Sequence, residues 1–328
     1  MEIDFVIPWV DGADPEWRKQ RQRYSGKPGD SEECRFRDWD LLRYWFRAVE
    51  AYAPWVHNVY FVTWDQLPPW LNTSHPKLHL IDHRDFIPEA YLPTFSSHTI
   101  ELNFHRIPSL SEHFVYFNDD MFLNAPVKPE DFFRNGLPCD CAVMGVFSPM
   151  STCEPYVHAQ CNVMGVLNMH FNKRKVLLQY APKWFDPRNG KAFLKNIYGA
   201  VTKNFSIFSN QHIPSSMLKS TFETVWEQEP ELLHSTCIHK FRDLGDVNQY
   251  IMSYYNLCSG KFHPRPAGFG KCYSIGWQSP ELHQDILRSK HKTVCINDNP
   301  NVHDFEKEKQ MLISLYEQKL PVKSSFEL

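Results

Sequence analysis

The chain has 328 residues, of which 42% are hydrophobic, so it is long enough to bury a substantial core. Its 35 basic and 38 acidic residues give a formal net charge of −3. Proteins that bind nucleic acid usually carry a strong basic field, so this balance argues against nucleic acid as a partner.

The first part of the chain alternates between strand patterns and helix patterns. Buried strands are predicted over four apolar runs, at 3–10, 58–63, 78–81 and 114–118. Amphipathic helices are predicted over 38–52, where Pro54 follows, and over 97–107. This alternation predicts an α/β protein whose sheet is mostly parallel.

The second part of the chain is less regular. Residues 139–205 are rich in Asn, Lys and aromatic side chains, and we interpret them as an irregular inserted or lid-like segment. Helices are predicted over 215–233, 246–258 and 304–318, with a glycine-rich loop over 260–276. We therefore expect one domain over 1–328, made of an α/β half at 1–138, the segment at 139–205 and a helical half at 206–328.

Several features predict a cytoplasmic protein. The nine cysteines form no paired C-x-x-C knuckles, and Cys139 and Cys141 are too close in sequence for an ordinary zinc site, so we expect reduced thiols. No apolar stretch reaches the roughly 18–20 residues that span a bilayer, and the strand-like start leaves no room for a signal peptide. The basic cluster at 173–175 could give a peripheral contact with the membrane, but three such charges more often mark a solvated helix face.

Acidic residues follow predicted strands at two places. Asn118, Asp119 and Asp120 come directly after the fourth strand, and Asp11 follows the first. Ligands of open parallel sheets bind beyond the carboxyl ends of the strands. Adjacent carboxylates repel each other, and a hard cation such as Mg²⁺ or Mn²⁺ would relieve that repulsion. A helix cap or a polar turn is the alternative, because Asn and Asp are favoured there too.

Other residue types add possible acid–base and phosphate chemistry. A neutral His212 could accept a proton from a hydroxyl, and Arg242 could hold phosphate oxygens with two hydrogen bonds. His98 and His239 are second candidates for contacts with phosphate or an acceptor. With 16 histidines in the chain, a structural role for any one of them stays open, and Asn297 and Asp298 could form a simple turn. The sequence has no P-loop, dinucleotide or nucleophile-elbow motif.

Four blocks of the sequence, in order, resemble those of one family. They are IDFVIPWVDGADPEW, the span from RFRDWDLLRYWFRAVEAY to HFVYFNDDMFL, the span from QHIPSSMLKSTF to HKFRDLGDVNQYIMSYYNLCSGK, and CINDNPNVHDFEKEKQMLISLYEQKLPVKSSFE. Together they resemble the Stealth family, which includes bacterial capsular and exopolysaccharide phosphotransferases and the eukaryotic N-acetylglucosamine-1-phosphotransferase. The chain is similar to the compact bacterial members.

The resemblance implies a core like the type-A glycosyltransferase fold and a specific reaction. A hexose- or N-acetylhexosamine-1-phosphate passes from a nucleotide-diphosphate sugar, expected to be UDP-linked, to a hydroxyl of a glycan acceptor. Nucleoside monophosphate is released, in capsular or exopolysaccharide synthesis, with Mg²⁺ or Mn²⁺ as cofactor. Lipid-linked glycans are among the expected acceptors, and contact with the inner face of the membrane would be peripheral.

The resemblance also assigns roles to individual residues. It gives catalytic roles to His212, Arg242, Asp120 and Asn118, and metal-binding roles to Asp119 and Asp120. Donor or phosphate contacts are expected at Trp9, Asp11, Gly12, His98, His239, Asn297 and Asp298. Two alternatives stay open, namely a type-A glycosyltransferase that releases nucleoside diphosphate and a glycan-binding protein without activity.

Overall fold

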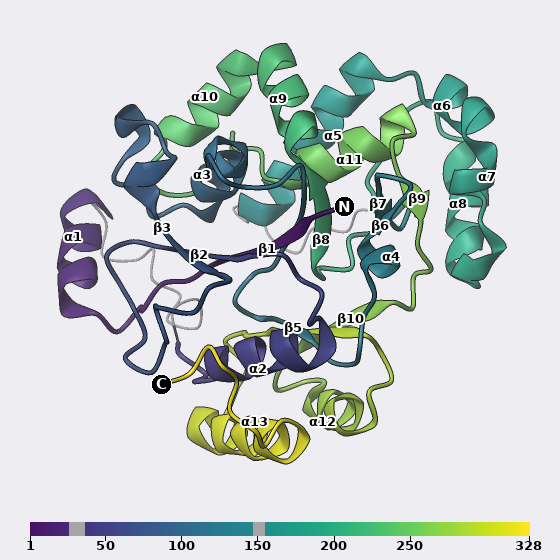
Figure 1. Cartoon of the computed structure of the whole chain (residues 1–328). Helices are drawn as coiled ribbons and strands as arrows, with labels where there is room; N and C mark the ends of the chain where they lie inside the picture. The colour runs from purple at the N-terminus through teal and green to yellow at the C-terminus, as the bar shows by residue number, and fades with distance from the viewer. Residues whose placement is uncertain (26–36, 147–154) are drawn as a thin grey trace.

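The computed structural model describes residues 1–25, 37–146 and 155–328 (Figure 1). Its main sheet has five strands in the order β3-β2-β1-β4-β8. They are β3 Leu78–Asp82, β2 Val59–Thr63, β1 Ile3–Pro8, β4 His113–Tyr116 and β8 Ser215–Leu218. The first four run parallel, and β8 pairs with β4 in the antiparallel direction. The prediction of an α/β protein with a mostly parallel sheet is confirmed.

Alternating side chains of the central strands enter two separate cores. In β1, Phe5 and Ile7 belong to one core, whereas Val6 belongs to the other, and all three are fully buried. Successive side chains of a strand point to opposite faces, so a strand that is apolar throughout needs a cover on both sides. The sheet is therefore the middle layer of three.

Helices from distant parts of the chain form the two outer layers (Figure 1). One face is covered by α2 Leu42–Tyr52, α12 Ser279–Arg288 and α13 Phe305–Lys319. The other is covered by α3 Ser97–Leu102, α5 Pro155–His170, α9 Lys219–Gln228, α10 Pro230–Ile238 and α11 Tyr250–Ser259. Helix α1, Pro15–Ser25, lies at the edge near β3. No helix in the described parts of the chain is long and apolar enough to cross a bilayer.

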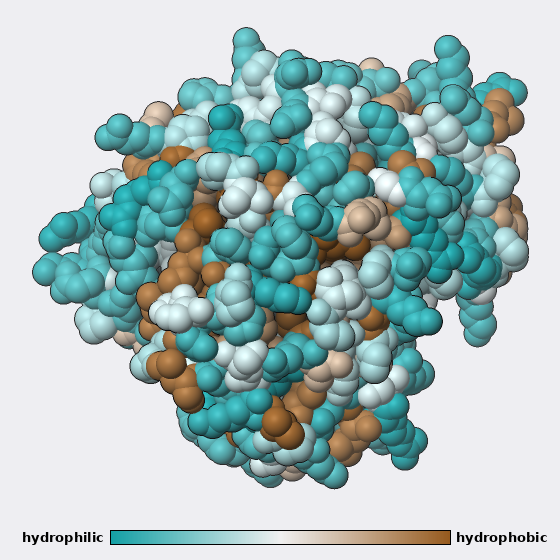
Figure 2. Space-filling model, in the orientation of Figure 1, coloured by the Kyte–Doolittle hydropathy of each residue, from teal (hydrophilic) through white to brown (hydrophobic). Residues whose placement is uncertain are grey.

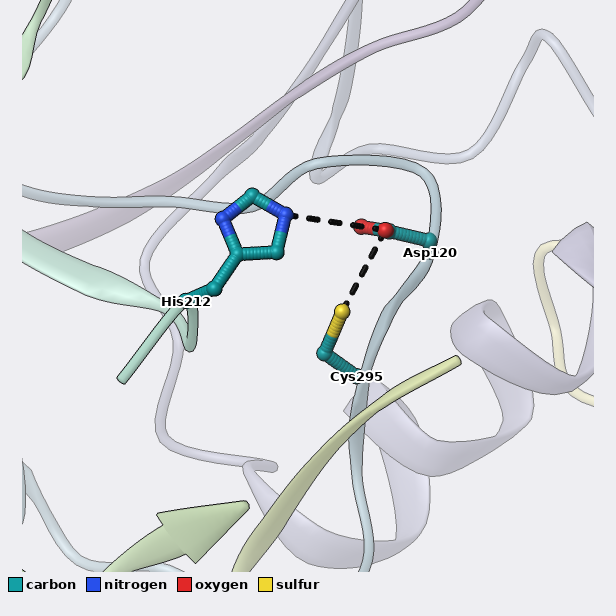
Figure 3. A group of neighbouring side chains, drawn as sticks. All are labelled: Asp120, His212 and Cys295. Atoms are coloured by element: carbon teal, nitrogen blue, oxygen red, sulfur yellow. Dashed lines mark hydrogen bonds and ion pairs between the residues drawn. The ribbon is translucent and has the colours of Figure 1, made fainter. Parts of the chain in front are cut away.

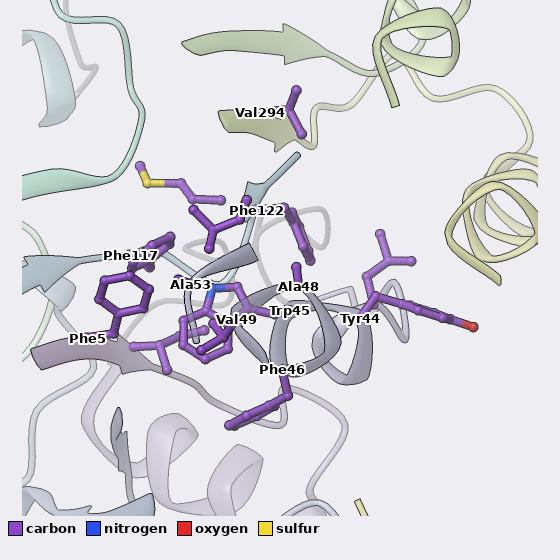
Figure 4. Close-up of a cluster of buried hydrophobic side chains, with 14 of the residues drawn as sticks. Phe5, Tyr44, Trp45, Phe46, Ala48, Val49, Ala53, Phe117, Phe122 and Val294 are labelled. Atoms are coloured by element: carbon purple, nitrogen blue, oxygen red, sulfur yellow. The ribbon is translucent and has the colours of Figure 1, made fainter. Parts of the chain in front are cut away.

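Helix α2 contributes the centre of the first core (Figure 4). Trp45 is fully buried and meets Phe117 edge to face, with ring centroids 5.4 Å apart. Phe117 in turn packs on Phe5 of β1 at 4.9 Å. Such aromatic pairs add about 0.5–1.5 kcal/mol beyond the burial of their area. This packing fixes the end of β4, from which the acidic residues follow.

A second, three-stranded sheet corrects part of the sequence prediction. It has the order β10-β11-β5, from β10 Gly270–Ser274, β11 Thr293–Asn297 and β5 Met121–Leu123. The predicted loop over 260–276 is thus wrong, because it contains β10 and the short strand β9 His263–Pro264. Gly270 lies against Thr293 so closely that a Cβ atom would come within 2.1 Å of its Oγ1 atom. Glycine here permits close strand pairing rather than a turn.

Other boundaries also differ from the prediction. The helix predicted over 215–233 begins as strand β8, and the helix predicted over 97–107 divides into α3 and a 3₁₀ turn at Phe104–Arg106. The remaining short elements are α4 Pro129–Phe132, β6 Phe133–Arg134, β7 Leu137–Asp140 and 3₁₀ turns at His83–Asp85, Glu89–Tyr91 and Pro187–Asn189. The strands β6, β7 and β9 form a third small sheet.

Residues 155–205 are mainly helical, so the irregular pattern expected there is wrong, whereas an inserted or lid-like role for the segment stays a prediction. Helix α5 is followed by α6 Lys173–Gln179, α7 Ala181–Trp184 and α8 Ala192–Ala200. Val163 and Leu167 of α5 are fully buried in the second core. The polar and aromatic residues obscured this helical pattern, and packing of α5 against α11 stabilises it. Seven cysteines are free thiols, as expected, while Cys34 and Cys153 lie outside the described residues.

Candidate active site

The acidic turn Asn118–Asp120 connects the main sheet to the second sheet. Before the turn, the Phe117 N–H donates to Val6 O of β1 at 2.9 Å. After it, the Ile296 N–H of β11 donates to Asp120 O at 2.8 Å. Both ends of the turn are therefore fixed by neighbouring strands, and its carboxylates lie at the carboxyl end of β4 as predicted.

His212 reaches this turn from the loop before β8 (Figure 3). Its Nε2 atom lies 3.7 Å from Asp120 Oδ2, and its Nδ1 atom lies 2.9 Å from Tyr250 Oη. The backbone of His212 has φ +46°, and Asn210 Oδ1 accepts a hydrogen bond from its N–H at 2.7 Å. A histidine with a positive φ is uncommon, and here this backbone conformation directs the imidazole toward the carboxylates.

The charge of Asp120 acts on the two titratable groups beside it. The side chain of Asp119 keeps contact with solvent, yet the surrounding protein and the Asp120 carboxylate raise its pKa to about 7. Asp38 adds to this negative field and raises the pKa of Asp119 further. Burial alone would lower the pKa of His212, but the facing Asp120 outweighs burial and raises it. The site therefore concentrates negative charge that a cation would neutralise.

Asn118 joins the same group through side-chain contacts. Its Nδ2 atom lies 3.5 Å from His212 Nε2, and its Oδ1 atom contacts the Tyr116 hydroxyl. That hydroxyl also donates to Glu101 Oε1 of α3 at 2.8 Å. Asn118, Asp120 and His212 are thus brought together, with α3 holding the turn from the side of the second core.

Two cysteines that sequence reasoning missed complete the surroundings of Asp120. The Cys295 thiol donates to Asp120 Oδ2 at 3.2 Å. Its sulfur atom lies 3.5 Å from that of Cys272 on the adjacent strand. Tyr250 was missed as well. It lies in a predicted helix, and helical spacing does not show that one of its buried tyrosines contacts a histidine. The cysteines could be found only through the pairing of β10 with β11.

A second group of predicted residues lies around Asp246, which is fully buried. His239 Nδ1 lies 2.7 Å from Asp246 Oδ1, and His98 Nδ1 lies 3.4 Å from Asp246 Oδ2. Arg242 donates from Nη2 to the Ser97 hydroxyl at 2.7 Å. These residues are grouped at the start of α3, about one helical turn from Glu101. Arg242 belongs to this second group, not to the immediate contacts of Asp120 and His212.

The first predicted strand ends in a turn that the side chain of Gln66 stabilises through a hydrogen bond. The Asp11 N–H donates to Gln66 Oε1 at 2.9 Å, and the Asp11 carboxylate accepts from the Ala13 N–H at 2.8 Å. Gly12 O accepts from Arg18 Nε at 2.6 Å, and Trp9 packs on the ring of Phe61. This Asp11 therefore stabilises its own turn, in the same sheet edge as the acidic turn.

Asn297 and Asp298 follow β11, beside the acidic turn. Arg37 donates to both carboxylate oxygens of Asp298, at 2.9 and 2.6 Å, and Trp39 Nε1 donates at 3.2 Å. Burial raises the pKa of Asp298, although Arg37 acts against this. Asn297 occupies the last position of β11, opposite Ser274. This bidentate pair anchors the segment that carries Asp38 near Asp119.

The residues of the acidic turn fit a divalent cation. Asp119 and Asp120 offer carboxylate oxygens, which Mg²⁺ and Mn²⁺ prefer. Among the described residues, the Oδ1 atom of Asp120 is buried without a hydrogen-bond partner. A bound cation would satisfy that atom and neutralise the pair.

A view of the surface shows apolar side chains gathered toward the middle of a largely hydrophilic face (Figure 2).

Solved structures overlap this chain loosely. The galactosyltransferase LgtC, solved in complex with donor and acceptor sugar analogues, is 9% identical, with a TM-score of 0.39 and coverage of 95% of each chain. Mouse xyloside xylosyltransferase 1 is 11% identical, with a TM-score of 0.38, and covers 90% of this chain and 97% of that one. Overlaps of this size carry no conclusion about activity.

Sequence comparison is far more specific. Models of Stealth conserved regions 1, 2 and 4 match residues 1–29, 35–139 and 284–328. The capsular polysaccharide phosphotransferase WcwK of Streptococcus pneumoniae is 40% identical over 99% of this chain and 98% of its own length. The exopolysaccharide phosphotransferase cps2G of Lactiplantibacillus plantarum is 42% identical over 99% and 96%. The receptor polysaccharide phosphotransferase WefC of Streptococcus gordonii is 40% identical over 100% and 99%. The chain therefore belongs to the Stealth family.

Proposed function

We propose that this protein is a metal-dependent phosphotransferase that moves a sugar-1-phosphate from a nucleotide-diphosphate sugar to a glycan hydroxyl. The observation that carries the proposal is the convergence of His212 on the carboxylate of Asp120 at the end of β4. Full-length relatives named as capsular and exopolysaccharide phosphotransferases support the reaction class. Capsular or exopolysaccharide synthesis is the process to which it would contribute.

The donor would carry a hexose or an N-acetylhexosamine linked to UDP. A glycan, free or lipid-linked, would be the acceptor, and nucleic acid has no part in the reaction. The protein would act in the cytoplasm, with at most peripheral contact at the inner face of the membrane. Trp9, Asp11 and Gly12 at the end of β1 would meet the nucleotide-sugar, because donors bind beyond the carboxyl ends of parallel strands.

Asp119 and Asp120 would hold Mg²⁺ or Mn²⁺. When bound there, it would supply charge neutralisation for the diphosphate and the departing nucleotide phosphate. His212 would accept the proton of the acceptor hydroxyl at Nε2. For this, its Nδ1–H must donate to Tyr250 Oη, which lies at 2.9 Å and fixes the orientation of the ring. Asn118 would position the same imidazole edge through its Nδ2 contact.

Arg242 would steady the oxygens of the transferring phosphoryl group, with His98 and His239 near it. Because Arg242 is exposed and donates to Ser97, its guanidinium must turn from that hydroxyl toward a bound donor. Asn297 and Asp298 would support the nucleotide side of the site. Phosphoryl transfer depends mainly on positioning and charge neutralisation, so no covalent intermediate with the protein is required.

The bond changes balance in one displacement. The acceptor oxygen forms a bond to the phosphorus that bears the sugar, and the bond from that phosphorus to the bridging oxygen breaks. Nucleoside monophosphate departs, and the hydroxyl proton passes to His212. The product is a phosphodiester between sugar and glycan.

The test is to incubate the purified protein with UDP-sugars, Mg²⁺ or Mn²⁺ and candidate glycan acceptors, and to identify the released nucleotide. We expect monophosphate, formed only with acceptor and metal and abolished by a chelator. Release of diphosphate would instead show a type-A glycosyltransferase. A protein that consumes no nucleotide-sugar under any of these conditions would be a glycan-binding relative.

A further inference from the structure

We propose that Asp120, His212, Cys295 and Cys272 form a site for one thiophilic divalent cation of the zinc class, and that this cation competes with the Mg²⁺ or Mn²⁺ of the reaction. The competition rests on the proposed function, because it requires Asp120 to serve both cations. The binding site itself does not.

Three of the four side chains already converge, because one ligand atom each of Asp120, His212 and Cys295 lies within 4.8 Å of the other two. With zinc bonds of about 2.0–2.3 Å, neighbouring ligand atoms lie about 3.2–3.8 Å apart. The sulfur atoms of Cys272 and Cys295 are 3.5 Å apart, and Cys295 Sγ is 3.2 Å from Asp120 Oδ2. His212 Nε2 is 3.7 Å from the same Asp120 oxygen. Three contacts thus link the four ligand atoms in a chain, and rotation of the Cys272 side chain would bring its sulfur atom to the same cation.

The fold fixes these positions without help from a ligand. Cys272 and Cys295 face each other in register on the parallel strands β10 and β11. Asp120 directly precedes Met121, the residue of β5 that pairs with Cys295. His212 precedes β8 and is pointed at Asp120 by its backbone (Figure 3). Because Cys272 and Cys295 belong to one small sheet and Asp120 directly precedes its third strand, the site is largely built in advance.

Partners of the ligand atoms also suit a metal. His212 Nδ1 is held by Tyr250 Oη at 2.9 Å, the kind of outer contact that fixes the tautomer of a metal-binding histidine. The Oδ1 atom of Asp120 has no hydrogen-bond partner in the described chain. Binding would release the thiol protons of Cys272 and Cys295 to solvent, since thiolates are the ligands.

The chemistry of the ligands distinguishes this cation from the one proposed for the reaction. Mg²⁺ takes oxygen ligands in an octahedron and gains nothing from sulfur. Zinc, cobalt and cadmium accept thiolate and imidazole in a tetrahedron. A thiophilic cation would therefore hold Asp120 and His212 together and withdraw both from the phosphoryl donor and the acceptor hydroxyl.

The experiment is a Co²⁺ titration of the reduced full-length protein, followed by absorption spectroscopy in the absence of Mg²⁺, donor and acceptor. We expect a saturable thiolate-to-cobalt charge-transfer band and the intense visible bands of a tetrahedral site, both removed by Zn²⁺. Cys272→Ser and Cys295→Ser should each weaken the charge-transfer band, whereas Cys161→Ser, at an exposed thiol, should not. Cys272 is half-buried, so its serine variant should fold and test the thiol contribution even if the variant at the buried Cys295 fails to fold.

A second arm measures inhibition by Zn²⁺ at a fixed excess of Mg²⁺, relative to the uninhibited rate of each variant. In Cys272→Ser the half-inhibiting zinc concentration should rise by at least about 10- to 100-fold, which is the cost of losing even an outer contact of a metal ligand. Absence of a saturable band in the wild type, or an undiminished band in both serine variants, would overturn the site. A clear band in a protein that transfers no sugar phosphate would preserve the site and reject only the proposed function.

Discussion

Nε2 of His212 lies 3.7 Å from Oδ2 of Asp120, although strands β5 to β7 and helices α4 to α8 separate the two residues in the chain. Asp120 is fixed by β11 and His212 by Tyr250 of α11, so three distant segments define one contact. Neither side chain supports the core, since both are about one quarter exposed. Substitutions here should affect chemistry much more than folding.

Replacing Asp120 with Asn tests the acidic turn. The change keeps the size of the side chain but removes the charge that a cation needs, so activity should fall about 10³-fold. The melting temperature should stay within a few degrees of the wild type, because the Asp120 side chain is one quarter exposed and the replacement has the same size. Initial rates and thermal melting are measured together, with Glu223→Gln on the exposed face of α9 as the control. A parallel loss of stability would assign Asp120 a structural role.

Replacing His212 with Asn removes the imidazole and keeps the backbone conformation of the loop. Asparagine tolerates a positive φ better than most residues, so the loop at φ +46° should persist. Loss of the proton acceptor should lower kcat about 10²- to 10⁴-fold. Tyr250→Phe removes only the Nδ1 partner and should lower kcat by about tenfold, with a smaller effect on KM. Wild-type kcat in His212→Asn would exclude the base role.

Arg242 is tested by comparing Lys with Ala. A lysine keeps the charge but not the two-pronged hydrogen bonds, so Arg242→Lys should recover only part of the activity that Arg242→Ala loses. We expect about a 10²-fold fall in kcat/KM for the alanine variant, with little change in melting temperature because the residue is exposed. Arg174→Ala, on the exposed side of α6, serves as the control. Equal rates in the wild type, Arg242→Lys and Arg242→Ala would exclude Arg242 from the mechanism.

Acid stability should depend on the buried pair of Arg47 and Glu327. Arg47 donates to both Glu327 oxygens, at 2.8 and 3.0 Å, and to Leu320 O at 2.9 Å. Burial opposes ionisation of Glu327, yet Arg47 outweighs it and lowers the pKa below 4.5. A lowered carboxyl pKa contributes stability that is complete above pH 4.5 and is lost as the pH falls through the lowered value.

Urea unfolding at neutral pH and at several acidic values checks this pair. Glu327→Gln should reduce the fall in stability below pH 4.5, and Arg47→Ala should cost about 3–5 kcal/mol at neutral pH. Arg84→Ala, at an exposed ion pair, should cause no comparable loss. An unchanged acid profile in Glu327→Gln would show that other carboxylates govern acid unfolding.

Local pattern was sufficient where burial alone determines structure. The apolar runs that became β1, β2 and β4 and the amphipathic α2 were predicted to within a few residues, because each is covered on the expected faces. Strand β10 was not, since Gly270 and Lys271 have low strand preference in isolation and the segment becomes a strand by pairing with β11. Strand β11 has a strand-like run, TVCIN, that the sequence analysis did not single out. Helix α5 was missed for a reason similar to that for β10, as its burial depends on α11.

The same distinction between local sequence pattern and tertiary contact applies to the residues of the site. Asp119 and Asp120 were predicted because their position after an apolar strand carries the information. Tyr250 and Cys295 could not be predicted, because their importance lies in contacts with His212 and Asp120 across the fold. Arg242 was expected to hold phosphate oxygens, and only the structure reveals its hydrogen bond to Ser97 in the second group.

The most direct test of the central claim follows the phosphorus atom attached to the donor sugar. The protein is incubated with a UDP-sugar labelled at that phosphate, a glycan acceptor and Mg²⁺ or Mn²⁺, and the label is located after separation of glycan and nucleotide. Our account predicts that the label moves into the glycan as a phosphodiester and that unlabelled UMP remains. Label retained in UDP, with unlabelled sugar on the glycan, would contradict it.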